Sequence, residues 1–144
     1  MDAMIKTSGK PQISLFIPYR KTDLDREYYL QKRDDKAVID RGLFGLFGGH
    51  LEGAETPEEA LSREVHEELA YVPKNARYFS RYEGATRVYH LFIEEVGPEF
   101  ESTITVQEGE YGKLLSAHDS ISSPLSSPIV RFTVAQLDEY LLSE

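Results

Sequence analysis

Apolar and polar residues alternate along the first strongly patterned part of the chain. The stretch QISLFIPY (12–19) places apolar side chains at nearly every second position, and EYYLQKR (27–33) contains a short run of tyrosine and leucine. A period of two is typical of strands that bury one face. We therefore expect two strands here, connected by the charged segment 20–26.

Later segments predict further strands. ARYFSRYEG (76–84) and TRVYHLFIEEV (86–96) are rich in aromatic and β-branched residues and predict a hairpin around Gly84. The segment 102–116 predicts one or two more strands with a glycine-containing break. The glycine-punctuated segment GLFGLFGGHLEG (42–53) indicates a shaped loop or a short strand, because glycine disfavours a helix.

A helix is predicted to begin at Pro57. Thr56 is a good cap, proline suits the first helical position, and Glu59 lies where a capping-box partner belongs. Apolar residues then recur at helical spacing and predict a core-facing stripe, namely Ala60, Leu61, Val65 and Leu69. The helix should end near Ala70, because Pro73 cannot continue it.

The C-terminal part predicts a loop and a second helix. The Ser/Pro-rich segment 116–128 indicates a mobile loop, and TVAQLDEYLL (133–142) predicts a helix with Thr133 and Gln136 as its capping box. The order of strands, helix, strands and helix fits a mixed α/β or α+β sandwich in which helices flank a sheet. At 144 residues we expect one domain, 1–144.

Composition and charge exclude several classes of protein. There is no cysteine, so disulfides, thiolate metal sites and cysteine nucleophiles are excluded. The first ten residues lack the apolar run of a signal peptide and no segment reaches membrane-spanning length, so we expect a cytoplasmic location without membrane contact. A net charge of −9 disfavours binding to a nucleic acid duplex.

The first predicted helix concentrates acidic residues on one side. Glu64, Glu67 and Glu68 are three and four residues apart, and Glu68 falls at the margin of the buried stripe. Such carboxylates repel each other by roughly 0.2–0.5 kcal/mol per pair. Either this is an ordinary solvated acidic helix, or the carboxylates bind a hard divalent cation through oxygen.

The spacing around this helix favours the second reading. Gly49 is followed after five residues by Glu55, and Glu55 after seven by Arg63-Glu64-Val65-His66-Glu67-Glu68. This arrangement resembles the Nudix box. Six of the seven fixed positions of that box match this sequence. The seventh, a glycine, is Ala70 here.

The resemblance implies a Nudix-type α/β/α sandwich with a mixed central sheet, and hydrolysis of a nucleoside diphosphate derivative with Mg²⁺ or Mn²⁺. It implies that the metal is held by acidic side chains and one carbonyl, namely Glu64, Glu67, Glu68 and the backbone of Gly48. Arg63 would pair with Glu55 and hold the glycine loop against the helix. Bound cations would explain how an acidic chain accepts a polyanion.

The resemblance does not decide which residue is the general base. The candidates are Glu67 in the box and a glutamate of a later loop. In that loop Glu108 is better placed than Glu110, and it is also a candidate metal ligand. Arg33, at the end of the second predicted strand, matches a position near the substrate phosphates. The glycine loop adds two candidate contacts to the substrate, Gly49 and His50.

Two departures from the pattern carry expectations of their own. Glycine normally permits a left-handed residue at the end of the helix, so Ala70 predicts a different helix end. Phe47 precedes the paired glycines, where many relatives have proline. Its ring either packs under the loop, which we favour, or stacks on a base.

The expected function is therefore Mg²⁺-dependent hydrolysis of a pyrophosphate linkage in a nucleotide-type small molecule, acting as a monomer or homodimer. A compact nucleotide such as a nucleoside triphosphate is favoured by the short chain. The alternatives are a catalytically silent Nudix module that binds a nucleotide or ADP-ribose as a regulator, and a plain scaffold domain.

Overall fold

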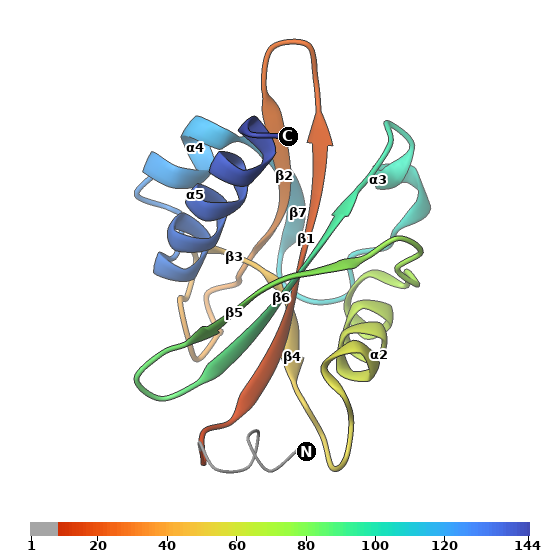
Figure 1. Cartoon of the computed structure of the whole chain (residues 1–144), viewed down its shortest axis with the longest axis vertical. Helices are drawn as coiled ribbons and strands as arrows, with labels where there is room; N and C mark the ends of the chain where they lie inside the picture. Colours follow the sequence, from red (N-terminus) through yellow and green to blue (C-terminus); the bar gives the residue numbers. More distant parts are fainter. Residues whose placement is uncertain (1–8) are drawn as a thin grey trace.

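The computed structural model describes residues 9–144 as one mixed β-sheet between two layers of helices (Figure 1). The predicted domain 1–144 thus includes residues 1–8, which lie outside the described residues. The strands are β1 (Gln12–Lys21), β2 (Arg26–Lys32), β3 (Phe44–Gly45), β4 (Phe47–His50), β5 (Arg77–Glu83), β6 (Val88–Glu95) and β7 (Tyr111–Ser116). The helices are α2 (Pro57–Leu69), α3 (Phe100–Thr103), α4 (Ala117–Ser122) and α5 (Pro128–Leu142).

Strand β1 is the centre of the sheet. It pairs in parallel with β6 and antiparallel with β2 and β4. Strand β5 pairs with β6, while β3 and β7 both pair with β2, all antiparallel. The predicted mixed sheet, the first two strands and the hairpin around Gly84 are thus confirmed. None of the helices within residues 9–144 is long and apolar enough to cross a bilayer.

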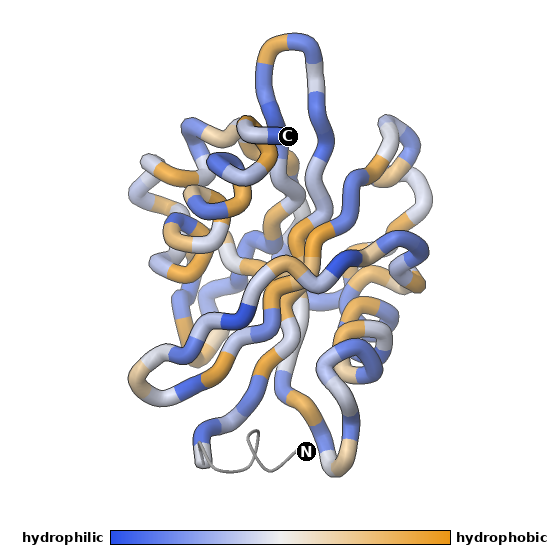
Figure 2. The backbone as a smooth tube through the Cα atoms, viewed as in Figure 1, coloured by the Kyte–Doolittle hydropathy of each residue, from blue (hydrophilic) through white to orange (hydrophobic). Residues whose placement is uncertain are grey.

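The sheet separates two hydrophobic cores (Figure 2). Alternation along β1 supplies both, because Ile13, Leu15 and Ile17 pack on the side of α4 and α5 while Phe16 packs on the side of α2. The predicted stripe of α2 is buried, and its members Leu61, Val65 and Leu69 lie in the second core. The capping box of Thr56 and Glu59 is formed as predicted. Helix α2 therefore has a fixed start and a fixed buried face.

The C-terminal helix begins five residues earlier than predicted. Ser127 is its cap and Pro128 its first residue, whereas Thr133 lies buried inside the helix and donates its hydroxyl to the carbonyl of Ile129. The predicted capping box of Thr133 and Gln136 is therefore wrong. The physical reason is that Ser127-Pro128 supplies the same cap and the same preset φ that begin α2.

The loop prediction for 116–128 needs correction, whereas the strand found within 102–116 agrees with the one or two strands predicted there. The segment 116–128 is not a plain loop, because Ser116 caps the short helix α4 by accepting from the N–H of Asp119. The segment 102–116 forms one strand, β7, and its first two residues belong to α3. In α3, Ser102 and Thr103 donate their hydroxyls to the carbonyls of Glu99 and Phe100, and a period-two pattern reveals neither these bonds nor the cap of α4.

A buried ionic contact joins α5 to the sheet. Asp138 accepts hydrogen bonds from the Arg26 guanidinium and from the Tyr28 hydroxyl. Burial alone would raise the pKa of Asp138, but the hydrogen bonds from Arg26 and Tyr28 outweigh it and hold that pKa below its ordinary value. The ionised form of Asp138 is therefore part of what fixes α5 on the sheet.

We expect Asp138→Asn to lower the free energy of unfolding at neutral pH by about 2–3 kcal/mol, because charge-assisted hydrogen bonds are lost. Since the folded-state pKa is lowered, the stabilisation is fully present above the unfolded pKa of about 3.9 and disappears as the pH falls through the folded value. Urea unfolding of both proteins across this range should show the difference closing in acid. Glu139→Gln, an exposed neighbour on α5, is the control and should change little; a gap that persists in acid would contradict the assignment.

Candidate active site

Two glycines of β4 allow the glycine loop to approach its neighbours closely. Gly48 has a φ of +136°, and a Cβ there would lie 2.0 Å from the carbonyl oxygen of Ser14. A Cβ on Gly49 would lie 2.4 Å from the carboxyl carbon of Glu64. Any side chain at these two positions would push β4 away from β1 or displace the Glu64 carboxylate.

Arg63 connects the helix to the glycine loop. Its guanidinium donates to both carboxylate oxygens of Glu55, at 2.7 and 3.0 Å, and to the carbonyl of His50 at 3.0 Å. The predicted pairing of Arg63 with Glu55 is thus present, in the bidentate geometry that arginine favours. The Arg63 guanidinium, assisted by the N–H of Glu52, lowers the pKa of Glu55 to about 2.

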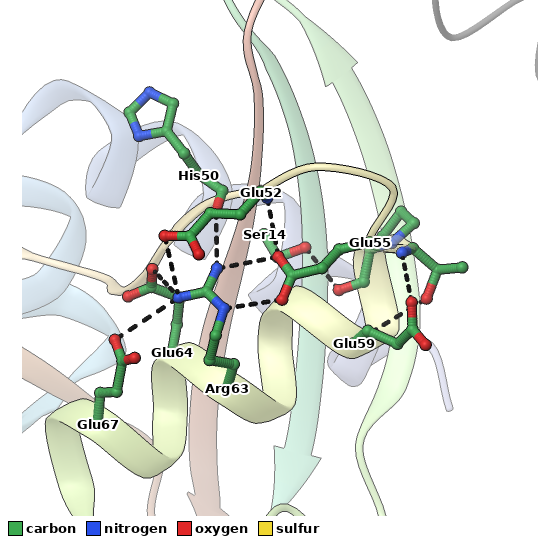
Figure 3. A network of polar contacts seen from close by, with 10 residues as sticks. Ser14, His50, Glu52, Glu55, Glu59, Arg63, Glu64 and Glu67 are labelled. Atoms are coloured by element: carbon green, nitrogen blue, oxygen red, sulfur yellow. Dashed lines mark hydrogen bonds and ion pairs between the residues drawn. The ribbon is translucent and has the colours of Figure 1, made fainter.

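The same guanidinium also faces the acidic side of α2 (Figure 3). Its Nη1 atom lies 2.9 Å from the Glu64 carboxylate and 3.6 Å from those of Glu52 and Glu67. One cation therefore lies among four carboxylates. Their negative charge exceeds what Arg63 can neutralise, so the site retains a strong attraction for further positive charge.

Glu68 is the most buried of the acidic residues, with only 3% of its surface exposed. Its carboxylate accepts the N–H of Gly48 at 2.8 Å. Burial, followed by the charges of Glu108 and Glu64, raises the pKa of Glu68 to about 9, although the Gly48 N–H stabilises the charged form. Burial also raises the pKa of Glu64, against the effect of Arg63. Both shifts mean that ionised carboxylates here need a cation.

The chemistry of the donor set suits a hard divalent ion. Carboxylate oxygens on one side of α2 and the backbone of Gly48 are the oxygen ligands that Mg²⁺ and Mn²⁺ prefer. As the side chains lie, however, Glu64 and Glu67 are drawn to Arg63. No three acidic or histidine side chains among residues 9–144 are grouped closely enough to enclose an ion. Binding of a cation would require these carboxylates to turn from Arg63.

Glu108 reaches the site on the segment that connects α3 to β7. The N–H of its neighbour Gln107 donates to the carbonyl of Glu68 at 2.8 Å, and the charge of Glu108 is among the causes that raise the pKa of Glu64 and of Glu68. The Glu108 carboxylate has no hydrogen bond or ion pair with any described residue, whereas Glu110 pairs with Lys32. The structure thus brings Glu108 rather than Glu110 to the acidic cluster, by which we mean the carboxylates of Glu64, Glu67 and Glu68.

The two remaining candidate residues for substrate contact, Arg33 and His50, have different surroundings. Arg33 and Glu108 line a cavity of about 280 Å³ together with the buried amide of Gln31. The Arg33 guanidinium donates to the carbonyl of Ile39 and to the Gln31 side chain. The His50 imidazole is exposed and points away from the carboxylates (Figure 3), so only its backbone carbonyl takes part in the cluster.

Gln107 is a site residue that the sequence analysis missed. Its side-chain amide donates to the carbonyl of Glu67 at 2.9 Å, and its backbone N–H donates to that of Glu68 at 2.8 Å. Helix C-termini leave such carbonyls unpaired. No sequence pattern marks this contact, because it joins residues about forty positions apart through loop packing.

Phe47 packs under the glycine loop, as favoured by the sequence. Its side chain is fully buried and stacks on Tyr29, with ring centroids 5.8 Å apart and planes 11° apart. Phe47 is therefore part of the core on the α2 side and has no face available to a base.

Ala70 ends α2 differently from expectation. It adopts the left-handed conformation, with φ of 52° and ψ of 41°, and donates its N–H to the carbonyl of His66. The predicted change of helix end is therefore wrong, because alanine takes the geometry that glycine would take. The bonds from Thr105 and Gln107 to the carbonyls of Leu69 and Glu68 help to hold this end in place.

The chain thus forms an α/β/α sandwich around a mixed sheet, in which Arg63 holds the acidic helix α2 against the glycine loop. This is the fold that the resemblance to the Nudix box predicts. The sequence matches the NUDIX domain over residues 16–125. The chain belongs to the Nudix family.

One curated relative is similar in sequence, and two solved structures share the fold. The 8-oxo-dGTP diphosphatase of Haemophilus influenzae is 34% identical over 77 residues, which cover 49% of this chain and 53% of that protein. The chain therefore matches about half the length of this curated relative. The NUDIX domain of Shewanella oneidensis NrtR, solved with ADP ribose, has a TM-score of 0.67 at 18% identity, over 93% of this chain and 87% of that one. An Ap4A hydrolase of C. elegans has a TM-score of 0.67 at 15% identity, over 93% and 99%.

We expect Ala70→Gly to stabilise the chain by about 0.5–1 kcal/mol. A left-handed residue with a Cβ is strained by about 1–2 kcal/mol, and glycine removes this strain at some cost in unfolded-state entropy. Urea unfolding measures the change. Ala135→Gly, in the exposed middle of α5, is the matched control and should destabilise by about 1 kcal/mol. Equal destabilisation by both changes would contradict the role of the left-handed cap.

Proposed function

We propose that this chain hydrolyses a pyrophosphate linkage in a nucleoside diphosphate derivative with the help of Mg²⁺ or Mn²⁺. The observation that carries the proposal is the excess of carboxylates on α2 beside Arg63, namely those of the buried Glu68, the partly buried Glu64 and the exposed Glu67. Such an excess is stable only with additional positive charge. Family membership supports the same chemistry.

Glu64, Glu67, Glu68 and the Gly48 backbone would hold the ion, with Glu108 as a further ligand or as the base. A bound divalent ion would neutralise the leaving phosphate and lower the pKa of water. In the reaction a water oxygen forms a bond to phosphorus, the bridging P–O bond breaks, and the leaving phosphate takes its electron pair. Arg63 orients Glu55 and the glycine loop without touching the reacting atoms.

Glu108 is the better candidate to accept the proton of the attacking water. Its carboxylate is exposed and makes no hydrogen bond or ion pair within residues 9–144. Glu67, in contrast, lies 3.6 Å from Arg63 and is a candidate ligand, and a carboxylate bound to a cation is a weak base. Arg33, which lines a cavity with Glu108, is placed to meet substrate phosphates.

A second surface has the chemistry to hold the base of the substrate. A hollow of about 330 Å³ lies between the β5–β6 turn and α5, lined by three aromatic side chains and Arg87. Tyr82 stacks parallel to Tyr89 and lies 4.8 Å from Phe132, centroid to centroid. Stacking on such rings is tolerant of the identity of the base.

Arg87 distinguishes this hollow from an ordinary apolar surface. The other eight arginines all donate side-chain hydrogen bonds, namely Arg20, Arg26, Arg33, Arg41, Arg63, Arg77, Arg81 and Arg131. Arg87 is half-buried and has no such partner within the described part of the chain. A half-buried cation without a partner favours an acceptor-rich ligand.

The register of the sheet places the hollow near the acidic site. Ile13 of β1 pairs with His50 of β4 on one side and with Tyr89 of β6 on the other. Adjacent strands lie about 4.8 Å apart, so the two backbones are separated by roughly 10 Å. The hollow lies on the α5 side of the sheet and the carboxylates on the α2 side, so a nucleotide with its base near Arg87 and its phosphates at β4 would pass over the start of β1. We therefore propose a compact nucleotide, such as a nucleoside triphosphate, as the substrate.

The relatives support a nucleotide derivative without choosing among them. Their names refer to 8-oxo-dGTP, ADP ribose and Ap4A. The proposal is tested by incubating the chain with a panel of nucleoside triphosphates, ADP-ribose and dinucleoside polyphosphates, with Mg²⁺ and again with chelator. Phosphorus NMR identifies the bond that is cleaved. Binding of a nucleotide without cleavage would favour a binding module instead.

We expect Glu67→Gln to lower kcat by about 10²–10⁴-fold without unfolding the chain, because it removes charge from the cation site. Steady-state kinetics on the best substrate and circular dichroism provide the two readouts. Glu59→Gln on the same helix, which takes part in capping, is the control and should affect stability more than kcat. A fully active Glu67→Gln variant would contradict the assignment.

We expect Arg87→Gln to raise KM by about 5–30-fold while kcat changes little, because it removes a cation that contacts the bound base rather than the reacting phosphate. Arg81→Gln provides the matched control, since Arg81 is exposed on the same hairpin but does not line the hollow. An unchanged KM in Arg87→Gln would remove the hollow from the substrate site.

A further inference from the structure

The segment 104–110 is fastened to the last turn of α2. The N–H of Thr105 donates to the carbonyl of Leu69 at 2.9 Å, and the N–H of Gln107 to that of Glu68 at 2.8 Å. The Gln107 side-chain amide reaches the carbonyl of Glu67 as well. Gln107 thus contacts the backbones of Glu67 and Glu68, two of the three candidate metal ligands on α2, at once.

The same segment is held from the opposite side by β2. The carbonyl of Glu108 accepts the side-chain amide of Gln31 at 3.2 Å, and the N–H of Glu110 donates to the carbonyl of Lys32 at 2.8 Å. Gly109 has a φ of +82°, and a Cβ there would lie 2.8 Å from the Lys32 carbonyl oxygen. The backbone around Glu108 is therefore fixed between a helix and a strand.

We propose that Gln107 is a positioning residue that sets the register of segment 104–110 on α2 and thereby directs Glu108 at Glu64 and Glu68. The Glu108 carboxylate has no polar partner within residues 9–144, so its position depends on the backbone that carries it. A shift of one residue would bring Gln107 or Gly109 to the acidic cluster instead. This inference rests on the proposed function, in which Glu108 acts at the cation site.

A structural role alone would have a small effect. Gln107 is exposed, and an exposed hydrogen bond stabilises a fold only slightly, whereas misplaced groups around a metal site typically cost 10–100-fold in activity or affinity. Loss of activity and loss of stability should therefore separate when Gln107 is changed.

The test compares Gln107→Met, which has a similar length but no donor, with Gln107→Arg, which can still donate to the helix carbonyls. We expect Gln107→Met to lower kcat roughly 10–100-fold with KM nearly unchanged, and Gln107→Arg to recover most of it. Gln136→Met, an exposed glutamine on α5, is the matched control and should match the wild type. Thermal unfolding midpoints should agree among all four proteins within a few degrees.

A double-mutant cycle with Glu108→Gln decides whether Gln107 acts through Glu108. In the Glu108→Gln background, Gln107→Met should change kcat less than about twofold, because the positioned carboxylate is already lost. An equal loss in both backgrounds, or none in the wild-type background, would overturn the inference.

Amide hydrogen exchange gives a readout that needs no substrate. Residues 104–110 should exchange faster in Gln107→Met than in the wild type and in Gln136→Met, and unchanged exchange would overturn the inference. If the wild-type chain cleaves no nucleotide while exchange responds as expected, the proposed function fails and the positioning of segment 104–110 by Gln107 stands.

Discussion

The burial of the Glu68 carboxyl group constrains the rest of the site. This side chain is almost entirely enclosed between α2 and β4, and within residues 9–144 its one hydrogen-bond donor is the N–H of Gly48. A carboxylate in such a place is costly unless positive charge lies nearby, and the neighbouring acids Glu64 and Glu108 make the cost larger. The helix nevertheless places this residue at the edge of its buried stripe, which is hard to reconcile with a purely structural role.

The residues around the Glu68 carboxyl group bring backbone and charge close to it. Gly48 approaches Ser14 and Glu68 only because it has no side chain, and Gly49 leaves room for the Glu64 carboxylate. Arg63 forms a bidentate contact with Glu55 through Nε and Nη2. Its third nitrogen, Nη1, faces the acidic residues of α2. The loop is thereby fixed by a contact that persists even if Glu64 and Glu67 turn toward a cation.

Local patterns in the sequence predict those features that depend on local forces. The two cores follow from period-two alternation in β1, and the start of α2 follows from Thr56-Pro57. The start of α5 could have been found from Ser127-Pro128, which repeats that signal. The conformation of Ala70 and the contacts of Gln107 could not, because both are set by a loop that packs on the helix from a distant part of the chain.

The acidic cluster and the hollow lined by Arg87 are separate parts of the structure, and this separation can explain how substrates are distinguished. The cluster lies on the side of the sheet that α2 covers, whereas the hollow is formed by the β5–β6 turn and α5 (Figure 1). Since the sheet separates them, side chains of the hollow can differ without moving the carboxylates of α2. Under the proposed function, cleavage and base recognition are then separable. On that proposal, the selectivity of this chain would depend on Arg87 and its aromatic neighbours rather than on the box.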